Sequence, residues 1–180
     1  MSRESLQELL DEIDAWCRDR DLAQIELVLI GGAAGTLVWG SPRLTADLDV
    51  VVKGRDELAG LEAAFGRSTG RAPWLEVVLA GIPHLPEGWM QRTSPVPGPW
   101  RRLAVRRLSA ADQIASKLMR FSPHDRRDIE FLCNLRPEVR ASLADLDGSD
   151  YWKVPDIWED QLEPRRDRVL AFLDGKIRTL

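Results

Sequence analysis

Asp47-Leu48-Asp49-Val50-Val51-Val52 is the stretch that decides the fold, because it places two carboxylates at the start of the strongest predicted strand. Side chains two positions apart in a strand point to the same face of the sheet. Asp47 and Asp49 therefore project together, while their apolar neighbours turn into the core. Two carboxylates so close repel one another unless a cation lies between them, and Mg²⁺ prefers oxygen ligands of this kind. The alternative is a strand end that carries two solvated aspartates.

Gly31-Gly32 lies upstream, between a predicted strand at residues 25–30 and a predicted short helix at residues 33–39. Such a turn exposes backbone N–H groups that can bind phosphate. Glycine also permits the close approach that a triphosphate needs. The alternative is a tight turn that only glycine can make.

Glu76 is the only charged residue in another predicted strand, residues 75–79. Because a buried unpaired carboxylate is costly, this side chain lies either at the exposed edge of its strand or beside a metal ion. In the second case Asp47, Asp49 and Glu76 would form a cup for two Mg²⁺ ions. Two such ions can activate an attacking hydroxyl and stabilise a leaving pyrophosphate.

Hydrophobic periodicity and turn residues predict the rest of the secondary structure. The first predicted helix carries the apolar face from Leu6 to Cys17 and closes at Asp21 and Leu22; the others cover residues 33–39, 55–65, 110–121 and 123–135. The predicted strands cover residues 25–30, 48–52, 75–79 and 103–108. The proline-rich residues 81–99 are expected to be mostly irregular, and residues 137–180 to be helical with breaks. This order predicts an α+β fold. Residues 1–108 would form a small mixed β-sheet flanked by helices, and residues 109–180 a helical part packed on it.

Capping residues predict where three of these helices begin. Ser5 followed by Glu8 indicates a capping box at the start of the first helix. Ser109, with Asp112 three residues later, indicates the start of the helix at residue 110. Pro123 suits the first turn of the helix that follows.

Charge is unevenly distributed, although the net charge of the 180 residues is only −4. Residues 1–60 carry 6 basic and 12 acidic residues, a net of −6, whereas residues 92–127 carry 9 basic and 2 acidic residues, a net of +7. This pattern argues against a general nucleic-acid coat. It suits a protein that grips a phosphate ligand or a local stretch of RNA; the alternative is a solvated loop and helix face.

Neither a membrane span nor a signal peptide is predicted, because no apolar run is long enough and the first 20 residues are acidic. Cys17 and Cys133 lie among apolar residues at helical spacing. They are expected to be core thiols of a cytoplasmic protein.

Four motifs, taken in order, resemble the signature of a known family. They are Val28–Gly32, Arg43–Val50, Leu108–Leu118 and Asp125–Ile129. Together they resemble the polymerase-beta-like nucleotidyltransferase superfamily, and most closely the abortive-infection type nucleotidyltransferases, which are toxins of bacterial toxin–antitoxin pairs. The resemblance covers residues 25–135. The chain departs from the family pattern at its third carboxylate, where Glu76 stands in place of the commoner aspartate.

The resemblance implies an enzyme that moves a nucleoside monophosphate from an NTP to a hydroxyl group and releases pyrophosphate. Asp47, Asp49 and Glu76 would bind two metal ions, Mg²⁺ or in its place Mn²⁺. With Lys117 these carboxylates would form the catalytic set. The nucleotide-binding residues that the resemblance implies are Gly31, Gly32, Arg43, Thr45, Lys117 and Asp128.

Lys117 would meet the triphosphate or the leaving pyrophosphate as a point charge. Asp125 and Asp128 would orient Lys117 or Arg43. The alternatives are an ordinary exposed lysine, and two aspartates that cap or pair on the surface of their own helix.

The acceptor hydroxyl is left open by the sequence. RNA, including the 3′ end of a tRNA, a hydroxyl of a partner antitoxin protein, and a small molecule such as an aminoglycoside are the three candidates. A different class, a non-catalytic module of the same fold that binds a nucleotide or a partner, is the alternative to an enzyme. Trp89 and Trp100 flank the proline-rich segment and would either stack a base or pin the loop.

Overall fold

The computed structural model describes residues 2–53, 58–78, 85, 88–118, 120–138, 167 and 171. The chain divides into two compact units: Met1–Ile82 with Thr93–Leu108, and Pro83–Arg92 with Ser109–Leu180. The predicted helical tail, residues 137–180, lies almost entirely outside the described residues.

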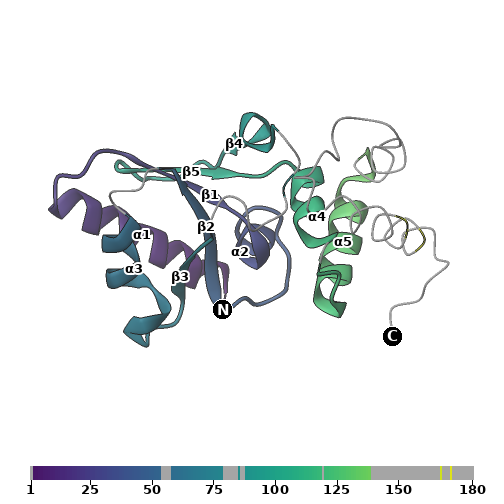
Figure 1. The fold of residues 1–180 in the computed structure, drawn as a ribbon, viewed down its shortest axis with the longest axis horizontal. Coiled ribbons are helices and arrows are strands. Elements are labelled where there is room, and N and C mark those ends of the chain that lie inside the picture. Colours follow the sequence, from purple (N-terminus) through teal and green to yellow (C-terminus); the bar gives the residue numbers. More distant parts are fainter. Residues whose placement is uncertain are drawn as a thin grey trace. The chain divides into compact units, whose positions relative to one another are not determined.

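A five-stranded mixed sheet with the order β3-β2-β1-β5-β4 forms the centre of the first unit (Figure 1). Its strands are β1 (Ile25–Leu29), β2 (Asp47–Lys53), β3 (Trp74–Val77), β4 (Ser94–Pro95) and β5 (Leu103–Arg107). The middle strand, β1, runs parallel to β5 and antiparallel to β2, while β3 pairs in parallel with β2. The α+β fold with a small mixed sheet is therefore confirmed.

Three helices and one 3₁₀ turn accompany this sheet: α1 (Arg3–Asp19), α2 (Gly31–Leu37), α3 (Leu58–Phe65) and η1 (Arg67–Thr69). The apolar stripe of α1 packs into the same core as the strands, and its members Leu6, Leu9, Leu10, Ile13 and Cys17 are at most 1% exposed. Burying one such leucine contributes about 1.5–3 kcal/mol. Trp16 of α1 meets Phe65 of α3 edge to face, with 6.0 Å between the ring centroids. These contacts fix both helices against the sheet.

The capping box predicted at Ser5 and Glu8 is wrong. α1 begins three residues earlier than such a cap requires, and Ser2 is its N-cap residue. The backbone N–H of Ser5 donates to the Ser2 hydroxyl at 3.3 Å. Ser2 therefore caps the helix in place of Ser5.

The proline-rich segment contains two short elements that the sequence did not predict, η2 (Trp89–Arg92) and β4. β4 pairs with β5 at the edge of the sheet, with Pro95 opposite Arg106. An edge strand tolerates proline because one of its backbone edges needs no donor. Residues 81–84, 86 and 87 of this segment, residues 55–57 of the predicted third helix and residue 79 of the strand predicted at residues 75–79 lie outside the described residues.

The described part of the second unit includes η2 and the helices α4 (Ala110–Leu118) and α5 (Pro123–Leu135). Ser109 caps α4, since its hydroxyl accepts from the backbone N–H of Asp112 at 3.0 Å. Pro123 occupies the first turn of α5 as predicted. Arg92 ties η2 to α4 through two bonds to the fully buried carboxylate of Asp112, the shorter of 2.7 Å. No helix in the described ranges is long and apolar enough to cross a membrane.

Candidate active site

The predicted carboxylates lie on neighbouring strands of the first unit. β2 opens with Asp47, and its parallel pairing with β3 places Asp49 directly opposite Glu76. Paired positions of adjacent strands share a face of the sheet, as do positions two apart in one strand. The backbone therefore brings all three residues to one face. Asp47 and Asp49 are half-buried, and Glu76 is exposed on the edge strand.

Asp47 is held by a hydroxyl from the loop that precedes β2. Thr45 Oγ1 donates to Asp47 Oδ1 at 2.8 Å, and Thr45 itself is buried. A hydrogen bond to an ionised acceptor is stronger than a neutral one. The orientation of this carboxylate is thus set within its own loop.

Asp49 lies against the glycine turn. Gly31 has a φ of +59°, a conformation that side-chain-bearing residues rarely adopt, and a Cβ at this position would overlap the carboxylate of Asp49. A Cβ on Gly32 would stand 2.9 Å from Thr45 Oγ1, closer than a relaxed contact allows. The side chains of Asp49 and Thr45 therefore occupy the space that the absence of a Cβ at the two glycines leaves open. Phosphate binding by the turn stays a prediction.

Arg43 brings a positive charge to the same turn. Its Nη2 atom lies 3.9 Å from the point where a Cβ on Gly32 would stand. Its loop is anchored to α2, because the Thr36 hydroxyl donates to the Arg43 carbonyl at 2.8 Å and the Ser41 N–H donates to the Gly35 carbonyl at 2.9 Å. The site thus combines two carboxylates with an adjacent guanidinium.

Glu76 occupies the first of its two predicted environments, the exposed edge of a strand. Its Oε2 atom accepts from the indole N–H of Trp74 at 3.2 Å. Among the residues that the structure describes, no three His, Cys, Asp or Glu side chains are grouped closely enough to hold a metal ion. The donor chemistry of Asp47, Asp49 and Glu76 nevertheless fits Mg²⁺, because all offer carboxylate oxygens on one face. Glu76 would have to turn away from Trp74 to join the aspartates.

Lys117 lies in the second unit and is 4% exposed. The alternative given for it, an ordinary exposed lysine, is therefore excluded. Its Nζ atom lies 2.7 Å from Asp128 Oδ2 and 3.7 Å from Asp125 Oδ1. The hypothesis that these two aspartates orient Lys117 matches this geometry.

Asp125 is fully buried and forms the capping box of α5 with Ser122, so the capping role given as an alternative for it is also observed. Arg120 donates to both of its oxygens at 2.8 Å, and its Oδ2 atom also accepts from the backbone and hydroxyl of Ser122. Burial raises the pKa of Asp125, but the bonds from Arg120 and Ser122 and the charge of Lys117 outweigh it and hold this pKa well below its usual value. Arg120, which lies beyond the end of α4 at Leu118, was not among the predicted site residues.

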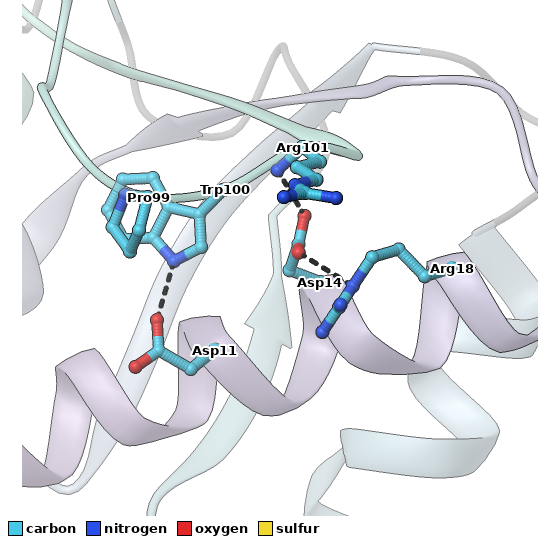
Figure 2. A pocket seen from close by; sticks show the side chains of 6 residues that line it. All are labelled: Asp11, Asp14, Arg18, Pro99, Trp100 and Arg101. Atoms are coloured by element: carbon cyan, nitrogen blue, oxygen red, sulfur yellow. Dashed lines mark hydrogen bonds and ion pairs between the residues drawn. The ribbon is translucent and has the colours of Figure 1, made fainter.

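Trp100 pins a loop, the second of the roles predicted for it. Its indole N–H donates to Asp11 Oδ1 at 2.8 Å, beside a pocket of about 170 Å³ (Figure 2). Asp14 Oδ1 accepts from the backbone N–H groups of Arg101 and Arg102 at 2.9 and 2.6 Å. The hydrogen bonds of Trp100, Arg101 and Arg102 fasten residues 99–102 to α1. The pocket is smaller than the usual small-molecule site of about 300–1,000 Å³.

The mixed sheet, the glycine turn and the strand that opens with two carboxylates define a nucleotidyltransferase-like protein. A family model described as a nucleotidyltransferase of unknown function (DUF6036) matches residues 4–133, and the chain belongs to this family. Neither the curated proteins nor the solved structures contain a significant match. The family supports a transferase whose substrate is a nucleotide. The closer resemblance to toxin–antitoxin enzymes stays a prediction.

Proposed function

We propose that this protein is a Mg²⁺-dependent nucleotidyltransferase that transfers a nucleoside monophosphate from an NTP to a hydroxyl group. The observation that carries the proposal is the common face of Asp47, Asp49 and Glu76 on two paired strands. A module that only binds a nucleotide has no need of three carboxylates on one face, because such groups repel each other without a cation.

In the reaction, the acceptor oxygen forms a bond to the α-phosphorus, and the bond from that phosphorus to the bridging oxygen of pyrophosphate breaks. Two Mg²⁺ ions would activate the acceptor and stabilise the leaving group. Asp47 and Asp49 would hold both ions. Glu76 would complete the second site and assist removal of the acceptor proton, which its exposure permits.

Arg43 would contact the phosphates that lie near Gly31 and Gly32, because its guanidinium is already next to that turn. Guanidinium groups match phosphate oxygens with two parallel donors. Lys117 would meet the triphosphate or the leaving pyrophosphate, with Asp128 holding its ammonium group in one orientation.

For the acceptor we propose RNA, with a tRNA 3′ end as the first substrate to test. The net charge of +7 over residues 92–127 supports this choice, since local positive charge attracts a polyanion. A hydroxyl on a partner antitoxin and a small-molecule antibiotic are the other outcomes of the test. The corresponding biological setting is a bacterial toxin–antitoxin pair in the cytoplasm.

Label transfer tests the proposal. The protein would be incubated with MgCl₂, each α-³²P-labelled NTP in turn, and total tRNA or a cell lysate. We expect label in RNA or in one protein band, and loss of at least about 100-fold in Asp47→Asn and Asp49→Asn. Asp19→Asn, which alters an exposed carboxylate at the end of α1, is the matched control and should retain activity. Equal transfer by the site variants, or none by the unaltered protein, would leave the non-catalytic module as the better explanation.

A further inference from the structure

We infer that Thr45 is a positioning residue that orients Asp47 for a metal ion, and that it acts in this way instead of contacting the nucleotide. The inference rests on the proposed function, because it assigns Thr45 a role toward the metal that Asp47 would bind. The inference is drawn from contacts that need no ligand. The buried Thr45 hydroxyl binds the Asp47 carboxylate, and Gly32 leaves room for the threonine.

The hydrogen bond has the features of a fixed contact. Thr45 Oγ1 lies 2.8 Å from Asp47 Oδ1, and Thr45 is 8% exposed. Water therefore competes little for this donor, and a hydroxyl removed from water is costly to leave without an acceptor. The bond engages Oδ1, and the inference assigns Oδ2 of the same carboxylate to the cation. Groups that bind a metal ligand from behind commonly set its orientation.

The first turn of α2, which contains Gly32, leaves room for the Thr45 side chain. The position of a Cβ on Gly32 would lie 2.9 Å from Thr45 Oγ1 and 3.2 Å from Thr45 Cβ. A side chain at residue 32 would thus displace the threonine. Because threonine is branched at Cβ, its χ1 angle has few accessible values. Glycine at residue 32 and a β-branched hydroxyl at residue 45 together fix the direction in which Asp47 points.

Thr36 of α2 provides a matched comparison, because it anchors the loop that contains Thr45. It is also a buried threonine, 5% exposed, and its hydroxyl donates to the Arg43 carbonyl at 2.8 Å. Its removal would loosen the loop without removing the donor to Asp47. A general effect of loop order can therefore be separated from the specific effect of the Thr45 hydroxyl.

Mn²⁺ titration followed by electron paramagnetic resonance tests the inference without any turnover. We expect Thr45→Val to raise the Kd for Mn²⁺ by about 10-fold or more, Thr45→Ser to stay within about threefold of the unaltered protein, and Thr36→Val to behave like Thr45→Ser. Thermal unfolding without metal accompanies each titration. If Thr45→Val does not fold, Thr45→Ala supplies the variant that lacks the hydroxyl.

Equal Mn²⁺ affinity of folded Thr45→Val and the unaltered protein would overturn the inference and leave the proposed function standing. So would an equal loss in Thr36→Val, because that result would assign the effect to loop order. An unaltered protein that binds no Mn²⁺, with or without a non-hydrolysable NTP analogue, would overturn the metal dependence of the proposed function and this inference with it.

Discussion

Replacing Asp125 by asparagine should destabilise the second unit at pH 7 by about 2–4 kcal/mol. The variant keeps the shape of the side chain and an acceptor for Ser122, but it removes a fully buried charge that faces Lys117 and Arg120. Breaking a buried ion pair costs about 3–5 kcal/mol. The expected loss lies at and somewhat below the lower end of that range, because the Arg120 side chain is 70% exposed and its pair contributes little, and because Lys117 retains Asp128 at 2.7 Å.

Urea unfolding followed by far-ultraviolet circular dichroism measures this change. Glu130→Gln, which removes an exposed carboxylate from the same helix, is the control and should shift the free energy of unfolding by less than about 0.5 kcal/mol. If Asp125→Asn unfolded at the same urea concentration as this control, the cluster around Lys117 would not stabilise the α4–α5 pair, and the reasoning would be refuted.

The pH dependence supplies an independent check on the same residue. The pKa of Asp125 is lowered in the folded chain, so its ionised form stabilises the fold above the unfolded value of about 4. That stabilisation is lost as the pH falls below this value toward the lower folded pKa. The difference in unfolding free energy between the unaltered protein and Asp125→Asn should therefore shrink between pH 5 and pH 2. A difference that stays constant over this range would contradict the assigned pKa.

Three further predictions concern the first unit. Gly31→Ala should lower the melting temperature more than Gly40→Ala, because both have positive φ but only the first would also push a Cβ into a carboxylate; equal shifts would contradict this. Asp14→Ala should destabilise by about 1–3 kcal/mol in thermal unfolding, since it removes the oxygen that accepts from two backbone N–H groups; an unchanged melting temperature would show that this contact is dispensable. Trp74→Phe should tighten Mn²⁺ binding by about 2- to 10-fold, because Glu76 no longer has to leave the indole N–H; weaker binding would place the ring in the site.

The strand pattern could be predicted from the sequence because burial alternates along it. Leu48 and Val50 are fully buried, while Asp47 and Asp49 keep partial exposure. The alternation of side chains between the two faces of a strand is a local property of the backbone. It can therefore be predicted without knowledge of the neighbouring strands. The register that places Glu76 beside Asp49 is not local, and only the paired sheet shows it.

Longer-range contacts explain what the sequence analysis missed. The burial of Lys117 depends on α5 packing against α4, which helical periodicity within α4 alone does not reveal. The hydroxyl partner of Asp47 depends on how the loop at residues 40–46 folds back on α2. The short strand β4 forms only because β5 offers an edge, in a segment whose prolines argue against a strand. In each case the contact is made with a segment too distant in the sequence for a local sequence pattern to predict it.

The fit of two side chains into the glycine turn has an evolutionary consequence. Residue 31 and Asp49 share one volume, and residue 32 and Thr45 share another. A relative that acquired alanine at residue 32 would need a smaller residue at position 45, and one that lost Asp49 would no longer require glycine at residue 31 for space. The four positions should therefore change together across the family, as two coupled pairs, even where the remainder of the helix and the strand diverges.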